Sequence, residues 1–132
     1  MELRLSILPS ELAVCRESPD APLPSWAAGA LVSITRTDEE LSTVCEAGCV
    51  PSGVQAERGW RALKIAGPIA FETTGVASAV VGPLADAKIS VFPIATFDTD
   101  YILVRSRDLD RAVEVLRHVG HQIESATESD VR

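Results

Sequence analysis

The chain has 132 residues, of which 46% are hydrophobic and 23% are charged, a composition that is typical of a globular protein and too apolar for a disordered one. Its formal net charge of −7 argues against a nucleic-acid or anionic-membrane surface, because phosphate groups are bound by clustered Lys and Arg. A chain of this length forms one ordinary domain or two small lobes, and it can bury a core without disulfides.

The start of the chain does not resemble a signal peptide. The segment MELRLSILPSEL contains Glu2 and Arg4 and lacks a continuous apolar core. No apolar run approaches the roughly 20 residues of a membrane span. The three cysteines are odd in number and follow no disulfide framework, which fits reduced thiols. We therefore expect a cytoplasmic protein.

The first half of the chain predicts strands and turns. Apolar and polar residues alternate at its start and again after a Pro-Ser turn, so residues 1–17 are expected to form a hairpin. The Pro-rich connector that follows is expected to be anchored by Trp26. Two more strands are expected at residues 30–36 and 41–46, around a polar turn at residues 37–40.

The second half of the chain begins with a strand and a helix. Residues 60–66 predict the strand, and residues 74–88 predict a helix whose apolar side chains recur every four residues, at Val76, Val80 and Leu84. Thr73 or Thr74 is the expected N-cap of this helix. Pro83 is expected to kink the helix or divide it, because a proline ring clashes with the carbonyl four residues back.

A strand pair and a second helix follow. The stretch ISVFPIATFDTDYILV, residues 89–104, predicts two adjacent antiparallel strands joined by a polar link at residues 96–100. Both strands are apolar on both alternating faces, so we expect both sides to be covered. The next helix has an apolar stripe formed by Leu109, Ala112, Val113, Leu116 and Val119. Gly120 is expected to end it, before a short strand at residues 122–125.

The ACT domain is the family that this region resembles. The resemblance rests on TFDTDYILV, preceded by the helix-like GVASAVVGPLADAK and followed by LDRAVEVLRHVGH. Within that superfamily the chain is most similar to small tandem-ACT proteins related to the aspartate kinase regulatory region and to the cytosolic arginine sensor of the mTOR pathway. Residues 33–51 and the segment ERGWRALKI match more loosely. Pro93 and Ala95 depart from the pattern, since relatives often have Ala and Ser there.

The resemblance implies an α+β fold of two ferredoxin-like lobes with antiparallel sheets. Residues 60–125 predict the βαββαβ order of this fold, with both helices on one face of the sheet. We expect a C-terminal ACT lobe at residues 60–126, a degenerate N-terminal ACT-like lobe at residues 1–59 and a frayed tail at residues 127–132. A weak echo between SITRTDEELSTV and IATFDTDYILV indicates an internal duplication.

ACT domains usually hold a free amino acid where a strand-to-helix loop of one unit meets a strand of its neighbour. The resemblance therefore implies ligand contacts at Thr74, Gly75, Val76 and Ala77. A helix N-terminus offers unpaired N–H groups and a positive dipole end, which can hold an α-carboxylate without a basic side chain. An ordinary capped helix start is the alternative explanation.

The other half of such a site needs acceptors for an ammonium group. Asp98 and Asp100 lie two residues apart, so in an extended chain their side chains point to the same side, where they could receive an ammonium or a cationic side chain. The alternative is that both acids only form a turn. Further contacts are expected from Ile94, Thr96 and Phe97, and from the first-lobe counterparts Ser33 and Ile34.

We expect no catalytic residue, no metal site and no cofactor. Cys45 and Cys49 are separated by three residues instead of the two usual in zinc ribbons, and no His lies near them in sequence. His118 and His121 flank a helix end, where a capping role explains them. No nucleophile motif surrounds a cysteine and no phosphate-binding glycine motif is present, although a Cys/His dyad stays open.

The expected function is a non-catalytic regulatory module that senses a free amino acid at the lobe interface. The ligand would bind two arrangements of such a module with different affinity, and the module would act through a homodimer or on a separate receiver protein. The alternative is a structural or dimerisation ACT-like protein with a decayed pocket, which Ala95 favours. A small thiol enzyme is a third hypothesis. None of these involves nucleic acid or a membrane.

Overall fold

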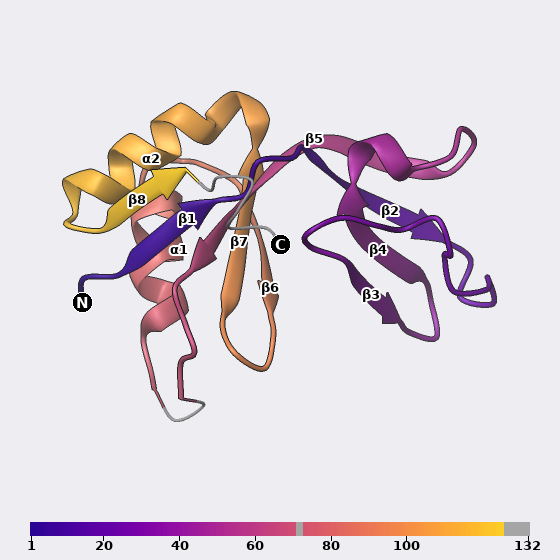
Figure 1. The fold of residues 1–132 in the computed structure, drawn as a ribbon, viewed down its shortest axis with the longest axis horizontal. Coiled ribbons are helices and arrows are strands. Elements are labelled where there is room, and N and C mark those ends of the chain that lie inside the picture. Colours follow the sequence, from indigo (N-terminus) through magenta and orange to yellow (C-terminus); the bar gives the residue numbers. More distant parts are fainter. Residues whose placement is uncertain (71–72, 126–132) are drawn as a thin grey trace. The chain divides into compact units, whose positions relative to one another are not determined.

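A computed structural model of the chain describes residues 1–70 and 73–125, and the chain separates into two compact units (Figure 1). Unit 1 consists of Met1–Pro9 and the described residues from Arg61 onward, and unit 2 is Ser10–Trp60. Strand β5 (Gln55–Ile65) begins in unit 2 and ends in unit 1. The expected frayed tail at residues 127–132 lies outside the described residues.

The sheet of unit 1 has the strand order β8-β1-β5-β7-β6 in the described residues. The end of β5 pairs with a strand on each side. Strand β1 runs antiparallel to β5 and parallel to β8, and β6 runs antiparallel to β7. The other strands are β1 (Arg4–Ile7), β6 (Val91–Ala95), β7 (Asp100–Arg105) and β8 (Gln122–Ser125).

Strand β1 lies in a different place from the one that the sequence predicted. Leu5 is opposite Ile65 in β5 and opposite Ile123 in β8. The predicted hairpin at residues 1–17 is therefore wrong, and β1 belongs to unit 1, whereas we expected it in the N-terminal lobe. The elements from β5 to β8 keep the predicted βαββαβ order, with β1 inserted between the first and the last of these strands.

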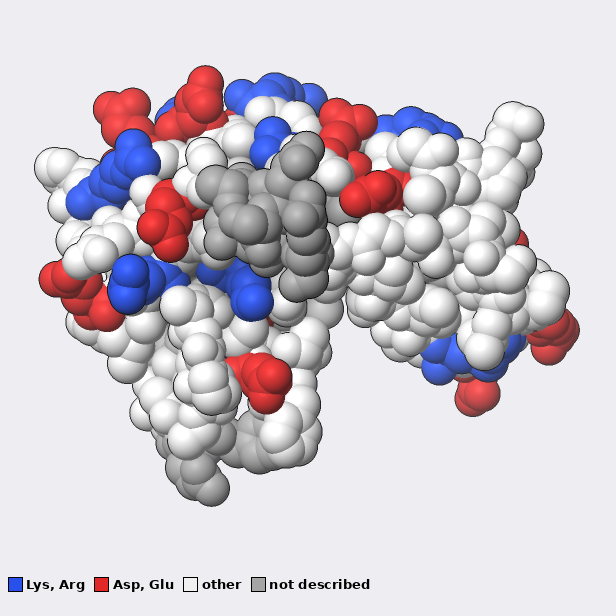
Figure 2. All heavy atoms as spheres, viewed as in Figure 1, with Lys and Arg blue, Asp and Glu red and all other residues white. Residues whose placement is uncertain are grey.

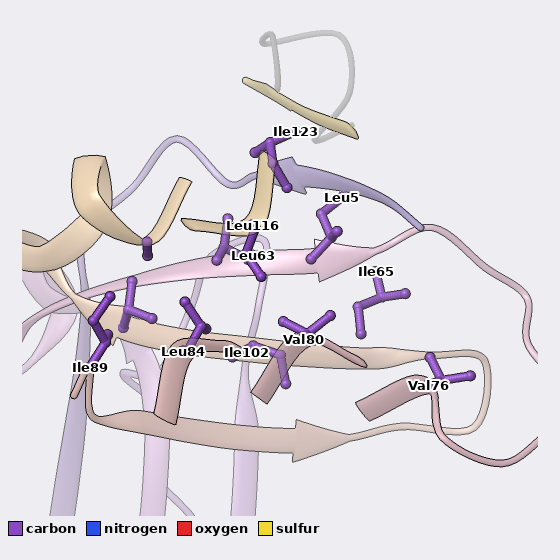
Figure 3. Packing of buried hydrophobic residues seen from close by; sticks show 12 residues of the cluster. Leu5, Leu63, Ile65, Val76, Val80, Leu84, Ile89, Ile102, Leu116 and Ile123 are labelled. Atoms are coloured by element: carbon purple, nitrogen blue, oxygen red, sulfur yellow. The ribbon is translucent and has the colours of Figure 1, made fainter. Parts of the chain in front are cut away.

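Helices α1 (Val76–Asp86) and α2 (Leu109–His118) share one hydrophobic core with the sheet of unit 1 (Figure 3). The four-residue stripe predicted for α1 is confirmed, because its three side chains are the buried residues of this helix. A short 3-10 turn, η2 (Ser106–Asp108), precedes α2. The core contains Leu5, Leu63, Ile65, Val76, Val80, Leu84, Ile89, Ile102, Val104, Ala112, Leu116 and Ile123.

The predicted stripe of α2 is correct except at its end. Ala112 and Leu116 are fully buried, but Val119 is 49% exposed, because it follows the last helical residue. The expected burial of both faces is confirmed on β7, where Ile102, Leu103 and Val104 are all inaccessible. Strand β6 is only half-buried. α1 and α2 are both too short to span a membrane, and they are the α-helices of the described residues.

Pro83 lies inside α1 and leaves one helix carbonyl without its usual donor, because proline has no N–H to offer the oxygen of Ala79. The Nε2 atom of His121 lies 2.8 Å from that oxygen. The Nδ1 atom of the same ring accepts the N–H of Leu3 over 3.0 Å, so the proton is on Nε2, which donates to Ala79. The ring of His121 thus joins Leu3, the residue before β1, to α1, while its backbone N–H donates to the carbonyl oxygen of Leu116 in the last turn of α2 over 3.0 Å.

Unit 2 is a sheet without an α-helix, and its residues are described throughout. Its strands follow the order β3-β4-β2-β5, and all three pairs are antiparallel. Trp26 packs on a small core of Ala and Cys side chains, as predicted for the connector. The elements are β2 (Leu12–Glu17), β3 (Ser33–Arg36), β4 (Leu41–Glu46) and the 3-10 turn η1 (Ala47–Cys49). The predicted α+β class is confirmed.

Candidate ligand-binding site

A cleft of about 400 Å³ opens in unit 1, where the chain between β5 and α1 faces the turn between β6 and β7. This volume lies in the range of small-molecule sites. All of its lining residues belong to unit 1. They are Ile69, Ala70, Thr73, Gly75, Val76, Ala77, Ser78, Ala95, Thr96, Phe97, Asp98, Thr99 and Asp100.

One side of the cleft is the start of α1, residues 75–78, which we call the helix lip. Gly75 is the N-cap residue, and its φ of 80° lies in the left-handed region that glycine adopts without strain. No side chain caps this described helix end, so the predicted cap at Thr73 or Thr74 is wrong. The hydroxyl of Ser78 donates to the carbonyl oxygen of Gly75 over 3.1 Å, so it acts as a donor and does not cap the first N–H groups.

The helix lip suits an anion. The first N–H groups of a helix have no carbonyl partner within it, and they lie at the positive end of the helix dipole. No acidic residue of the described chain occupies the first turn of α1, so no carboxylate of the helix competes for these groups. The left-handed turn at Gly75 exposes the backbone at this point without a Cβ atom in the way.

The opposite side of the cleft is residues 96–100, which we call the acid lip. The N–H of Thr96 donates to the carbonyl oxygen of Thr99 over 2.9 Å, and the N–H of Thr99 donates to the hydroxyl of Thr96 over 3.3 Å. Asp98 is exposed in this turn, whereas Asp100 is half-buried at the first position of β7. Ionised carboxylates accept strong hydrogen bonds from ammonium and guanidinium groups, so the acid lip suits a cation.

A hydrogen bond joins the acid lip to the chain that leads into the helix lip. The N–H of Ile69 donates to the carbonyl oxygen of Asp98 over 2.7 Å. Phe97, at the tip of the turn, is 79% exposed and borders the cleft. No Lys, Arg or His lines the cleft among the described residues, so its charged side chains are the two aspartates.

The structure brings most of the predicted ligand contacts together around this cleft. Thr74 and Ile94 are each adjacent in sequence to a residue that lines the cleft, but they do not line it themselves. Ser33 and Ile34 lie on β3 in unit 2, where Ile34 is 40% exposed. As ligand contacts all of these residues stay predictions. The ones that line the cleft are Gly75, Val76, Ala77, Thr96, Phe97, Asp98 and Asp100.

The sequence analysis missed several lining residues. Thr99 is 6% exposed, although it lies in a polar link where an exposed side chain is the ordinary expectation. The signal in the sequence that could have indicated Thr99 is a second threonine three residues after Thr96. Small and apolar residues in a loop carry no such signal. The other missed residues are Ile69, Ala70, Thr73, Ser78 and Ala95.

The cysteines lie in unit 2, outside the cleft. Burial is the main cause, and the neighbouring Cys45 the next, of a Cys15 thiol pKa that is raised to about 11. Burial also raises the pKa of Cys45, with Cys49 as the next cause. Thiols with raised pKa values are protonated at neutral pH and are poor nucleophiles. In the described part of the chain, no three His, Cys, Asp or Glu side chains gather where they could hold a metal ion.

Positive and negative side chains are interspersed on the face of the molecule shown in Figure 2. On that face Lys and Arg do not gather into a separate basic patch. This distribution agrees with the net charge of −7. It is typical of a solvated protein surface rather than a phosphate-binding one.

Two family models match the chain. The model of the ACT domain matches residues 55–118, which run from the start of β5 to the end of α2 and include both lips of the cleft. A second model, which describes an N-terminal domain, matches residues 10–53. These residues lie within unit 2.

The solved structures that are similar to this chain include one at high and one at low sequence identity. Protein Atu0741 from Agobacterium tumefaciens is 39% identical, with a TM-score of 0.91 over 97% of this chain and 96% of that one. The ligand-free regulatory subunit of aspartate kinase from Thermus thermophilus is 11% identical, with a TM-score of 0.60 over 83% of this chain and 93% of that one. At this lower identity the likeness concerns the fold alone.

A curated human protein also matches part of the chain. It is the cytosolic arginine sensor for mTORC1 subunit 1, which is 39% identical over 59 residues. The matched segment is 44% of this chain and 18% of the sensor. The chain therefore corresponds to a small part of that protein.

Proposed function

Because this chain belongs to the ACT-domain family, we propose that it is a non-catalytic regulatory module that binds a free amino acid in the cleft between the helix lip and the acid lip. One observation carries the proposal: the same cleft has two carboxylates on one side and, on the other, a helix N-terminus that no side chain of the described residues caps. An amino acid is a zwitterion, with one anionic and one cationic group a few bonds apart, so it can satisfy both sides at once.

The polarity of the cleft supports one orientation of the ligand. The α-carboxylate would accept N–H groups of the helix lip, where the helix dipole adds favourable electrostatic energy. The α-ammonium would donate to Asp98 or Asp100. Ile69 and Val76 offer apolar surface for the rest of the molecule. The reverse orientation would place the carboxylate beside two like charges, which costs free energy.

The identity of the amino acid depends on how the two carboxylates are used. If one of them receives the α-ammonium, the other can receive a cationic side chain, which favours arginine or lysine. The relative described as an arginine sensor makes arginine the first candidate to test. A neutral amino acid would leave the second carboxylate to water, because Asp98 is exposed.

As a regulatory module the protein must change its arrangement on binding, and the ligand can drive such a change only by its differential affinity for the two arrangements. The signal would pass to a second copy of the chain or to a separate receiver protein. We place the module in the cytoplasm, in line with its reduced cysteines and with the relative described as cytosolic.

Thermal unfolding in the presence of each of the twenty amino acids tests the proposal. A ligand at 100 times its dissociation constant adds about 2.7 kcal/mol to the free energy of unfolding. We expect such stabilisation from one or a few amino acids. The double variant Asp98→Asn/Asp100→Asn should lose it while its melting temperature without ligand stays near that of the wild type.

A matched control removes two acids from the polar turn of unit 2. Asp38 and Glu39 are exposed there, and the variant Asp38→Asn/Glu39→Gln should keep the ligand response. Stabilisation by none of the twenty amino acids would favour the alternative of a structural or dimerising protein with a decayed pocket. Ala95, which lines the cleft without a hydroxyl, is the feature that favours that alternative.

A further inference from the structure

The side chain of Thr99 is directed at the sheet and not at the solvent. Its hydroxyl donates to the carbonyl oxygen of Ile65, the last residue of β5, over 2.6 Å in a buried environment. Only 6% of Thr99 is exposed, although both of its neighbours in the acid lip, Asp98 and Asp100, are more accessible. The acid lip is therefore tied to β5 at the residue that separates its two carboxylates.

Gly67 brings a second part of the same chain segment against the acid lip. A Cβ atom at this position would lie 2.9 Å from the carbonyl oxygen of Asp98 and 3.0 Å from Cβ of Thr99. Any larger residue would therefore push the turn away from β5. Two residues further on, the N–H of Ile69 donates to the same Asp98 oxygen over 2.7 Å.

These contacts hold the acid lip against the segment that precedes the helix lip in sequence. The segment from Ile65 to Ile69 leads directly into the loop before the helix lip, and it holds Asp98 and Thr99 of the acid lip. Since Thr99 lies between the two aspartates in sequence, a movement of Thr99 moves both carboxylates relative to Gly75. A site that is held in its binding geometry before the ligand arrives loses less entropy on binding.

We propose that Thr99 is a positioning residue of the ligand site, which acts through its hydroxyl bond to Ile65 and its close contact with Gly67 to set the separation of the acid lip from the helix lip. This inference rests on the proposed function, because it assigns Thr99 to the site without direct contact to the ligand. It makes the hydroxyl of Thr99, and not its size, the property that matters.

The test compares Thr99→Val, which keeps the size and removes the hydroxyl, with Thr99→Ser, which keeps the hydroxyl. Amide hydrogen exchange without ligand is the first measurement. The N–H of Ile69 donates to the Asp98 oxygen, and the N–H of Thr96 donates to the Thr99 oxygen. Both N–H groups should exchange about tenfold faster in Thr99→Val, because losing the hydrogen bond of the Thr99 hydroxyl destabilises the turn by about 1.4 kcal/mol. In Thr99→Ser they should exchange at the wild-type rate. The N–H of Gln122, which bonds to Leu3 elsewhere in unit 1, should not change.

Binding is the second measurement, made with an amino acid that stabilises the wild type. Its dissociation constant should rise about tenfold in Thr99→Val and remain unchanged in Thr99→Ser. Gly67→Ala should also weaken binding, because its Cβ displaces the turn, whereas Gly48→Ala is the control, since a Cβ there meets no atom within 4 Å.

Unchanged exchange at Ile69 and Thr96 in Thr99→Val would overturn the proposal without reference to any ligand. Faster exchange with an unchanged dissociation constant would also overturn it, because Thr99 would then be a purely structural residue. Failure of the proposed function is a separate result: no amino acid would stabilise the wild type, and this is known before a variant is made.

Discussion

Two turns of this protein have the same local hydrogen bonds and different surroundings. In residues 37–40 of unit 2, the N–H of Thr37 donates to the carbonyl oxygen of Glu40 over 2.9 Å, and the N–H of Glu40 donates to the hydroxyl of Thr37 over 3.1 Å. In residues 96–99 of unit 1, Thr96 and Thr99 form the same two bonds at 2.9 and 3.3 Å. In each turn the first threonine closes the loop through its hydroxyl.

The difference between the two turns lies in their fourth residue. Glu40 is half-buried and carries a charge, whereas Thr99 is buried and bonds to the end of β5. The second turn also faces the helix lip, whereas unit 2 has no α-helix in Ser10–Trp60, all of which is described. The threonine-closed turn is thus a local structure that occurs in both units, and in unit 1 it lines a cleft together with a helix start.

The largest expected effect concerns α1, one of the two α-helices in the described residues of unit 1. His121→Ala removes the donor to Ala79 and the acceptor for Leu3, and it leaves both backbone groups without this partner. We expect a loss of about 2–6 kcal/mol in the free energy of unfolding, since each of the two groups left unsatisfied costs about 1–3 kcal/mol. Chemical denaturation measures this loss.

A double variant gives this prediction a specific control. Pro83→Ala restores an N–H at position 83, which can donate to the Ala79 oxygen within α1. His121→Ala should therefore cost less in the Pro83→Ala background than in the wild type. Equal costs in the two backgrounds would mean that the bond between His121 and Ala79 does not contribute to stability.

The next effect concerns unit 2 and depends on pH. The pKa of Cys15 is raised by burial from 9.0 to about 11, so the folded protein retains a proton that the unfolded chain releases above pH 9. The contribution of this thiol to the free energy of unfolding is fully present below pH 9 and is lost as the pH rises through about 11. We expect the free energy of unfolding to fall by about 2 kcal/mol between pH 8 and 11, from 1.36 kcal/mol per pKa unit.

The control for this prediction is Cys15→Ala, which has no thiol to titrate at this position. Denaturation at a series of pH values should show a smaller alkaline loss in this variant than in the wild type. Parallel curves for the two proteins would contradict the prediction. The wild-type loss should appear in amides of unit 2, such as that of Ala47, which donates to Glu11.

The smallest effect tests the comparison of the two turns directly. Thr37→Ala and Thr96→Ala each remove the hydroxyl that closes a turn. We expect each to lower the free energy of unfolding by about 1 kcal/mol, because the two local structures are alike. Only Thr96→Ala should also weaken the stabilisation by an amino acid. If both variants lost the stabilisation by an amino acid equally, the acid lip would have no specific role in binding, and the prediction would be wrong.

Much of the fold was predicted from local patterns. The spacing of Val76, Val80 and Leu84 predicted α1 because these side chains recur on one face of a helix. β4 was predicted at residues 41–46, and the polar link between the two apolar strands became the acid lip. Each of these patterns extends over a few residues, so the physical cause lies within the segment itself.

The parts that were not predicted depend on residues far apart in sequence. β1 joins β5 and β8 across most of the chain, and a short alternating strand carries no mark of its partners. Thr99 is buried because β5 and Gly67 lie against it. His121 bonds to the Ala79 oxygen because Pro83, which lies in α1, has no N–H to donate to that oxygen.

The amino-acid sequence alone determined where the helices and most strands form, and it indicated the ACT-domain family, since periodicity, turn residues and a contiguous motif act over short distances. The tertiary structure alone decided where β1 pairs, which threonine is buried, and that two carboxylates and a helix N-terminus line one cleft. Those features depend on packing between distant segments, whose free energy is gained only when the chain is folded.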